Sequence, residues 1–262
     1  MTPTAAVQIS HLDAYYGDRK ILSNINMTVN TGEVMVIMGG SGSGKSTLLR
    51  HLLGLNTPVT GAIMLLGEDI TKLDAVGMMA LRKQMGVAFQ GGALFGSMTV
   101  ADNVELPLRE HTNLDRKTMQ IMARMKLEVV NMAGHEHLLP AQLSGGMVKR
   151  VALARAIIMD PKLLFFDEPS AGLDPVVAAE LDDLILKLRD AMKMTIIVVT
   201  HELDSAFKIA DRITVLDRGV ILCSGTVEEV KRCPDERVQA LLTRTPANEN
   251  VDAADYIHRL TR

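Results

Sequence analysis

Hydrophobic and polar positions along the chain follow two main patterns. Short, strongly apolar runs cover residues 34–38, 163–166 and 195–199, and such runs are typical of strands buried on both faces of a parallel sheet. Between the last two runs, residues 175–192 have apolar positions at helical spacing. A strand, a helix and a second strand in this order predict a right-handed crossover, so we expect the last two strands to be parallel neighbours in one sheet.

Other segments predict antiparallel strands. Residues 25–29 alternate apolar and polar positions, which is the pattern of a strand with one exposed face. Strand-like stretches also cover residues 7–12 and 62–66. We therefore expect an antiparallel layer beside the parallel sheet. Residues 213–223 read as a separate hairpin.

One further strand is expected to end on a polar side chain. Residues 73–85 have helical spacing, and the short apolar stretch at 86–89 that follows them reads as a buried strand ending on Gln90.

The middle of the chain predicts a mostly helical insertion over about residues 91–160. It begins with a glycine-interrupted loop, after which apolar positions fall at helical spacing over 100–140, with Pro107 and Asn113 as expected breaks. A further helix is expected over 148–159. The fold class is therefore α/β, with a mostly parallel sheet, an antiparallel β layer and a helical subdomain.

Composition narrows the class of protein. The 262 residues are 47% hydrophobic and 23% charged, as in a globular domain. A net charge of −3 leaves no excess of positive charge that would attract nucleic acid. The two cysteines are too few for a disulfide framework. We expect neither a signal peptide nor a membrane span, so any membrane role should come through partners.

The end of the chain reads differently from the rest. We place one domain at residues 7–243 and a polar linker and tail at 244–262. The tail has two interpretations. It could form a helix with one apolar stripe that docks on a neighbour. It could equally be a frayed terminus, because an isolated helix of this length is marginal in water.

A glycine-rich loop follows the apolar run at 34–38 and precedes a predicted helix. Its residues fit the pattern G-x-x-x-x-G-K-[ST] and are Gly39, Gly40, Ser41, Gly42, Ser43, Gly44, Lys45, Ser46 and Thr47. The glycines let backbone N–H groups turn towards a phosphate, and the helix N-terminus adds its positive end. Lys45 would supply a charge for the β- and γ-phosphates, and the Ser46 hydroxyl a ligand for Mg²⁺. The sequence therefore predicts a P-loop NTPase core that binds ATP and Mg²⁺.

Two carboxylates and a histidine follow the later apolar strands. Asp167 and Glu168 end the run at 163–166, where Asp167 could hold the Mg²⁺ and Glu168 could polarise an attacking water. His201 follows the strand at 195–199 and should lie at the same sheet edge. A capping or surface histidine is the alternative reading.

A second glycine turn opens a helix at Ser144, Gly145 and Gly146. It offers another helix N-terminus for an anion, with Ser144 either as an added donor or as a plain N-cap.

Taken together, these motifs resemble the ATP-binding subunit of an ABC transporter over about residues 7–243. Six motifs occur in the family's order: residues 39–47, Gln90, 143–146, 165–168, 170–174 and His201. The resemblance implies the ABC ATPase fold and ATP hydrolysis coupled to transmembrane transport.

It also implies a head-to-tail homodimer, in which Ser144, Gly145 and Gly146 of one protomer close on ATP held by the other's P-loop. Tyr16 matches the family's adenine-stacking aromatic, and Tyr15 is its competitor. By ring chemistry alone, a packing role is an equally good interpretation for either tyrosine.

The remaining roles follow from the same resemblance. Gln90 matches the residue that reaches the Mg²⁺ and the attacking water, and the loop after it matches the surface that grips the permease. Glu168 matches the general base, His201 the γ-phosphate contact, and Asp174 the residue that couples the two sites across the dimer.

A narrower likeness rests on three short stretches. Residues 143–150, in which Met147 stands where many family members have Gln, are similar to the Mla-type ATPases of Gram-negative bacteria, and so are residues 89–95 and 106–112. Those ATPases power phospholipid movement between the inner and outer membranes from the cytoplasmic face of the inner membrane. They work with an integral permease, a lipid-binding MCE-domain protein and a STAS-domain subunit. Three alternatives to a phospholipid-transport ATPase remain: an ABC ATPase that drives transport of another solute, a non-transport ABC protein, and a regulatory nucleotide-binding module without turnover.

Overall fold

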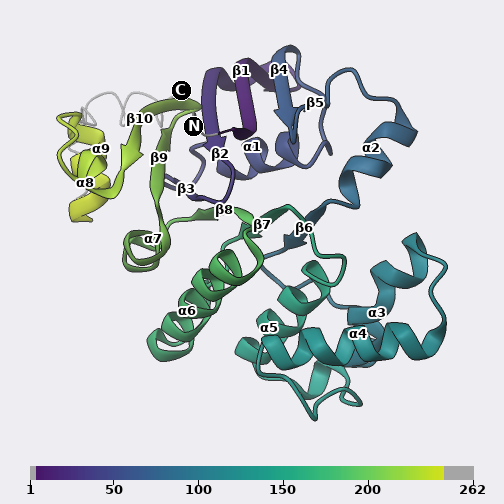
Figure 1. The fold of residues 1–262 in the computed structure, drawn as a ribbon. Helices are drawn as coiled ribbons and strands as arrows, with labels where there is room; N and C mark the ends of the chain where they lie inside the picture. Colours follow the sequence, from purple (N-terminus) through teal and green to yellow (C-terminus); the bar gives the residue numbers. More distant parts are fainter. Residues whose placement is uncertain (1–3, 245–262) are drawn as a thin grey trace, which may run out of the picture.

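A six-stranded sheet forms the centre of the molecule (Figure 1). The computed structural model describes residues 4–244. The strands run in the order β10-β9-β3-β8-β7-β6, and all neighbours are parallel except the β9–β10 hairpin. Their bounds are β3 Val34–Met38, β6 Met85–Ala88, β7 Leu163–Asp167, β8 Thr195–Thr200, β9 Arg212–Asp217 and β10 Val220–Thr226. The predicted parallel pair, β7 and β8, and the predicted hairpin are both confirmed.

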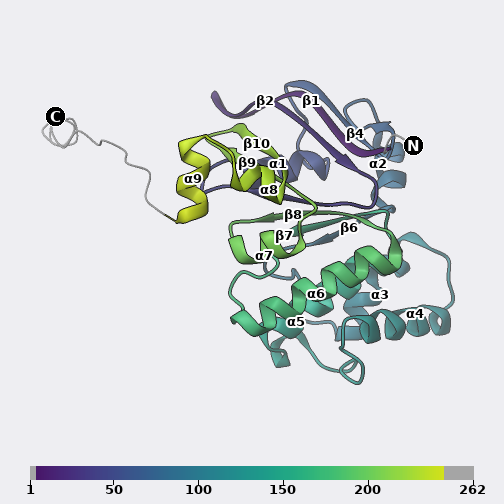
Figure 2. The same ribbon diagram turned by 60° about the vertical axis from the view of Figure 1, so that its left-hand side comes forward.

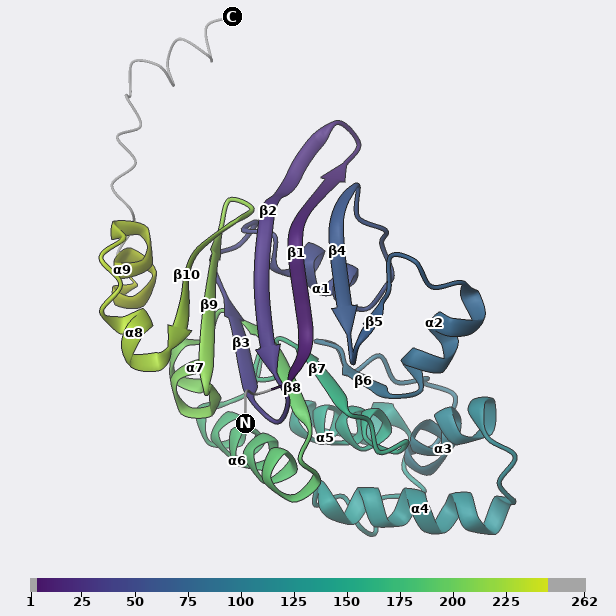
Figure 3. The same cartoon turned by 45° about the horizontal axis from the view of Figure 1, so that its top comes forward.

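A second, antiparallel sheet lies on one side of the first and is seen face-on in Figure 3. Its order is β2-β1-β4-β5, with β1 Ala5–Tyr16, β2 Arg19–Asn30, β4 Thr60–Leu65 and β5 Glu68–Asp69. The predicted antiparallel layer is confirmed. Tyr15 and Tyr16 are paired with Lys20 and Arg19, so both tyrosines lie at the end of β1.

Helices cover the other face of the central sheet (Figure 2). On that side α3 Val100–His111, α4 Arg116–Val129 and α5 Gly145–Ala156 pack together, and α6 Pro175–Met192 runs beside them. The remaining elements are α1 Lys45–Leu52, α2 Ala75–Arg82, the 3₁₀ turn η1 Pro140–Gln142, α7 Leu203–Ile209, α8 Val227–Lys231 and α9 Glu236–Thr243.

Two hydrophobic cores explain the strongly apolar runs. Successive side chains of a strand point to opposite faces, and β3 sends Val34 and Val36 into the core under the helices, but Met35 and Ile37 into the core under the antiparallel sheet. Phe165 and Phe166 of β7 divide in the same way. Because both faces of the central sheet are covered, strands such as β3 are apolar at every position.

The prediction that Pro107 breaks the helical insertion is wrong. Pro107 lies inside α3, although a proline removes one intrahelical hydrogen bond. Val104 and Leu108, on the same stretch, are 0% and 1% exposed, and their burial holds the helix together across the proline. The expected break at Asn113 lies between α3 and α4.

Several predicted boundaries move by a turn or less. The helix expected from residue 148 begins at Gly145, because the Ser144 side chain accepts a hydrogen bond from the Met147 N–H, as an N-cap does. The predicted tail lies outside the described residues, apart from Arg244.

Candidate nucleotide site

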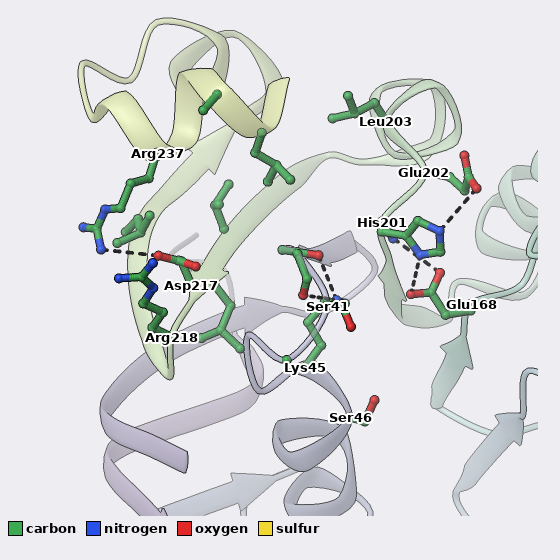
Figure 4. A pocket seen from close by; sticks show the side chains of 18 of the residues that line it. Ser41, Lys45, Ser46, Glu168, His201, Glu202, Leu203, Asp217, Arg218 and Arg237 are labelled. Atoms are coloured by element: carbon green, nitrogen blue, oxygen red, sulfur yellow. Dashed lines mark hydrogen bonds and ion pairs between the residues drawn. The ribbon is translucent and has the colours of Figure 1, made fainter. Parts of the chain in front are cut away.

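A pocket of about 880 Å³ opens where the carboxyl ends of β3, β6, β7 and β8 meet (Figure 4). Parallel sheets place ligand sites at this edge. The predicted residues that line it are Gly39, Gly40, Ser41, Gly42, Lys45, Ser46, Gln90, Asp167, Glu168 and His201. Residues far apart in the chain are thus brought to one site.

The glycine loop joins β3 to α1, as the sequence predicts. Gly44 is the N-cap of α1 with φ 108°, a backbone conformation that favours glycine. A Cβ on Gly39 would lie 2.1 Å from the Leu216 carbonyl oxygen, so β9 packs directly against the loop. The Ser43 hydroxyl is buried and has no hydrogen-bond partner among the described residues.

Lys45 folds back over this loop. Its Nζ donates to the carbonyl oxygens of Gly39 at 2.8 Å and Gly40 at 3.0 Å. Burial lowers the pKa of the Lys45 ammonium, and the charges of Glu168 and Asp167 partly oppose this. The ammonium is therefore inside the pocket and hydrogen-bonded to groups without a formal charge, which leaves it able to attract an anion.

Asp167 and Glu168 lie at the end of β7. Burial raises the pKa of the Asp167 carboxyl, as does the charge of Glu168, while Lys149 and Lys45 lower it. An oxygen set of Asp167, the Ser46 hydroxyl and the Gln90 side chain is the kind that Mg²⁺ prefers, and all three residues line the pocket.

The Glu168 carboxylate is held by the end of β8. It accepts hydrogen bonds from the Thr200 hydroxyl at 3.1 Å and the His201 N–H at 3.3 Å, and its Oε1 lies 2.9 Å from His201 Nδ1. The Glu168 backbone has φ 49°, which is uncommon outside glycine. The expected meeting of His201 and Asp167 at one sheet edge is confirmed, and His201 additionally faces Glu168.

Other predicted residues lie away from this pocket. Ser144 caps α5, and Asp174 caps α6 by accepting from the N–H groups of Val176 and Val177. A Cβ on Gly146 would lie 2.7 Å from Val177 Cγ1, so the starts of α5 and α6 pack together.

The tyrosines and three loop residues are also absent from the pocket lining. Tyr16 is 85% exposed and Tyr15 is 42% exposed, and Lys20 Nζ lies 5.6 Å from the centroid of the Tyr15 ring. Ser43, Gly44 and Thr47 belong to the loop and the start of α1 but do not line the pocket.

Sequence reasoning missed one wall of the pocket. Arg237, Ala240, Leu241 and Arg244, from α9 and the residue after it, lie opposite the sheet edge. No local pattern marks these residues, because their place depends on how β10 and α8 return the chain to the sheet.

Reasoning from the sequence also missed Lys149. Its Nζ donates to the carbonyl oxygens of Gln90 and Glu168. The lysine is visible in the sequence beside the glycine turn, but nothing in the pattern indicates its partners.

Comparisons with known proteins agree with this geometry. The sequence profile of the ABC transporter family matches residues 22–171. The chain is 39% identical over 257 residues to the intermembrane phospholipid transport system ATP-binding protein MlaF of Haemophilus influenzae, covering 97% of each chain. It is 42% identical over 226 residues to MlaF of Escherichia coli K12, covering 86% of this chain and 84% of that one.

A solved structure of an ATP-binding cassette has a similar fold. An ATP-binding cassette in a dimeric, post-hydrolysis state with bound ADP and Pi superposes with a TM-score of 0.77 at 29% identity, covering 84% of this chain and 98% of that one. Among residues 4–244, no helix is both long enough and apolar enough to cross a membrane. The family profile and the identity to these relatives show that the chain belongs to the ABC transporter family, as a subunit that binds and hydrolyses ATP.

Proposed function

We propose that this ATPase powers phospholipid movement between the inner and outer membranes through a partner permease. The observation that carries the proposal is the 39% identity to an MlaF protein along 97% of both chains. The departure at Met147 leaves Ser144, Gly145 and Gly146 unchanged, so the residues that would touch phosphate are intact.

The site residues take the following roles in this proposal. The P-loop N–H groups and Lys45 bind the phosphates. Ser46, Asp167 and Gln90 would hold Mg²⁺, which would supply positive charge beside the transferred phosphoryl group. Glu168 accepts a proton from the attacking water. His201, hydrogen-bonded to Glu168, orients that carboxylate and contacts the γ-phosphate.

A homodimer completes the site. Ser144, Gly145 and Gly146 lie outside the pocket of their own chain, and a helix N-terminus is a ready anion site. We assign them to ATP bound by the partner, with Asp174 coupling the two sites. Tyr16 is the better candidate of the two tyrosines for stacking on adenine, because its ring is the more open at 85% exposure.

The proposed complex has three further components: an MlaE-like integral permease, an MlaD-like MCE-domain lipid-binding protein and an MlaB-like STAS-domain subunit. The ATPase would lie at the cytoplasmic face of the inner membrane through these partners. Residues 7–243 are its ATP-binding domain, with the helical subdomain at about 91–160 and the tail at 244–262. Phe95, in the loop after Gln90, is 51% exposed and supports that loop as the permease contact.

The role of Glu168 is tested by Glu168→Gln. This variant keeps the shape and the hydrogen-bond acceptor but cannot take a proton, so we expect ATP to bind normally and phosphate release to stop. ATP affinity and phosphate release should be measured on the same preparation, with wild-type protein as the control. Wild-type phosphate release by Glu168→Gln would refute the assignment.

The cargo is tested by purifying the tagged protein from its host's membranes in mild detergent and identifying the chains and lipids bound to it. Recovery of an MCE-domain protein, a permease and phospholipid is the expected result. Recovery of a different permease with a soluble solute receptor would keep the ATPase mechanism and refute the lipid assignment.

A further inference from the structure

Helix α5 holds the segment after β6 through two basic side chains. Arg155 donates to the carbonyl oxygens of Gly92 at 2.7 Å and Ala93 at 2.8 Å. Lys149, nearer the start of the helix, donates to the carbonyl oxygen of Gln90. The backbone of residues 90–93 is therefore attached to α5 at both ends.

Lys149 also reaches a second strand. The same Nζ lies 3.2 Å from the carbonyl oxygen of Glu168, so one ammonium joins the end of β6, the end of β7 and the first turns of α5. Backbone carbonyls are fixed points of the chain, unlike the ends of side chains. A donor shared between two of them therefore links the backbone of Gln90 to the backbone of Glu168.

Lys149 is held through its ammonium by backbone oxygens of two residues. It is half-buried, and burial lowers the pKa of its ammonium, while the charges of Asp167 and Glu168 oppose that effect. Among the ion pairs of the described residues, none includes Lys149. A partly desolvated ammonium without a direct carboxylate partner costs free energy, and its acceptors both belong to residues of the nucleotide pocket.

The position of Lys149 in α5 ties these contacts to the start of that helix. The helix begins at Gly145, one turn before Lys149, and Ser144 caps it. Movement of this helix start would therefore carry the Lys149 ammonium with it.

We propose that Lys149 is a positioning residue that couples the start of α5 to the placement of Gln90 and Glu168, so that ATP turnover depends on where the helical subdomain lies. The inference rests on the proposed role of Glu168 in hydrolysis. The Lys149 ammonium donates to backbone oxygens, and the proposed role does not require it to touch ATP.

The test compares three variants in the complex purified from membranes. Lys149→Met keeps the length of the side chain and removes the donors. Lys149→Arg keeps the charge and the donors. Lys126→Met is the matched control, because Lys126 is a lysine of α4 with 16% side-chain exposure that pairs with Asp160 and contacts neither Gln90 nor Glu168. For each variant, kcat and KM for ATP, ATP affinity and Tm are measured.

We expect Lys149→Met to lower kcat about tenfold, which is about 1.4 kcal/mol, while KM and ATP affinity stay within about twofold of wild type. Lys149→Arg should keep most of the wild-type kcat, because it keeps the charge and the donors. Lys126→Met should keep the wild-type kcat even if its Tm falls.

Two results would overturn the proposal. One is an unchanged kcat in Lys149→Met. The other is a loss of kcat matched by an equal loss in Lys126→Met at a similar fall in Tm, because a merely structural role predicts that outcome. Glu168→Gln separates this proposal from the one on which it rests. If Glu168→Gln is inactive and Lys149→Met is normal, only the positioning role fails, whereas turnover by Glu168→Gln removes the assignment of Glu168 itself.

Discussion

Replacing Gly92 by alanine should destabilise the contact between the loop after β6 and helix α5. Gly92 has φ +73°, and a Cβ there would lie 2.6 Å from Val148 Cγ1. Two costs follow. The left-handed backbone costs a residue with a Cβ about 1–2 kcal/mol, and forcing extra volume into a packed contact costs about 1–3 kcal/mol.

Relief by a small movement is restricted on both sides of the contact. Val148 is β-branched and lies on a helix, where one χ1 rotamer is strongly preferred. Gly92 is fixed by its N–H, which donates to the Phe89 carbonyl oxygen at 2.8 Å, and by its carbonyl oxygen, which accepts from Arg155. We therefore expect Gly92→Ala to lower the free energy of unfolding by roughly 2–5 kcal/mol.

The assay is urea unfolding of the purified protein, followed by circular dichroism. Gly91→Ala is the matched control, because a Cβ at Gly91 meets nothing within 4 Å and its φ is not in the left-handed region. We expect that control to stay within about 0.5 kcal/mol of wild type. In the double variant, Val148→Ala removes the clashing methyl group. It should recover the part of the lost unfolding free energy that comes from the clash and leave the part that comes from the left-handed backbone.

Equal stability of Gly92→Ala and Gly91→Ala would refute the reasoning as a whole. A loss in Gly92→Ala that Val148→Ala does not reduce in a double-mutant cycle would refute the steric part.

Three other perturbations test different parts of the structure. Lys45→Ala removes the pocket ammonium and should weaken ATP binding itself, so unchanged affinity by calorimetry would remove Lys45 from its proposed role. Burial raises the pKa of Asp182 in the folded protein, so this carboxyl costs stability as pH rises above its unfolded value. The free energy of unfolding of Asp182→Asn, measured against that of wild type, should therefore rise as pH increases above about 4. A difference that is the same below and above that pH would contradict this. Burial, followed by hydrogen bonding to Cys233, raises the pKa of Cys223 to about 11. Alkylation of Cys223 at pH 8, followed by mass spectrometry, should therefore be a few hundredfold slower than alkylation of a free cysteine. Equally fast labelling would disprove this.

The sequence predicts most accurately where local chemistry decides the structure. Residues 34–38 are all apolar because β3 supplies side chains to two cores, and the observed strand has those same bounds. The helix at Pro175–Met192 is also predicted to the residue, because Asp174 caps it and a proline occupies its first position. Gln90, Asp167, Glu168 and His201 each follow a buried strand, and parallel strands bring such positions to one edge.

The sequence fails where tertiary packing decides. Pro107 has the local signature of a helix break, but the burial of Val104 and Leu108 maintains the helix. The α9 wall of the pocket and the partners of Lys149 depend on contacts between segments far apart in the chain. A pattern of residue types carries no information on which backbone carbonyl a lysine reaches.

The separation of two predicted anion sites within one chain has a consequence for the assembly. The P-loop lines the pocket beside Asp167, while Ser144 caps a helix whose start packs on α6 and lies outside that pocket. Each helix N-terminus can stabilise negative charge, yet a single chain directs only one of them at the carboxylates that support hydrolysis. If both serve one nucleotide, the second must come from another copy of the chain. Because α5 also holds the backbone at Gln90 and Glu168 through Lys149, the helix that would touch one ATP also positions the groups that act on the other, and the two proposed sites become mechanically linked.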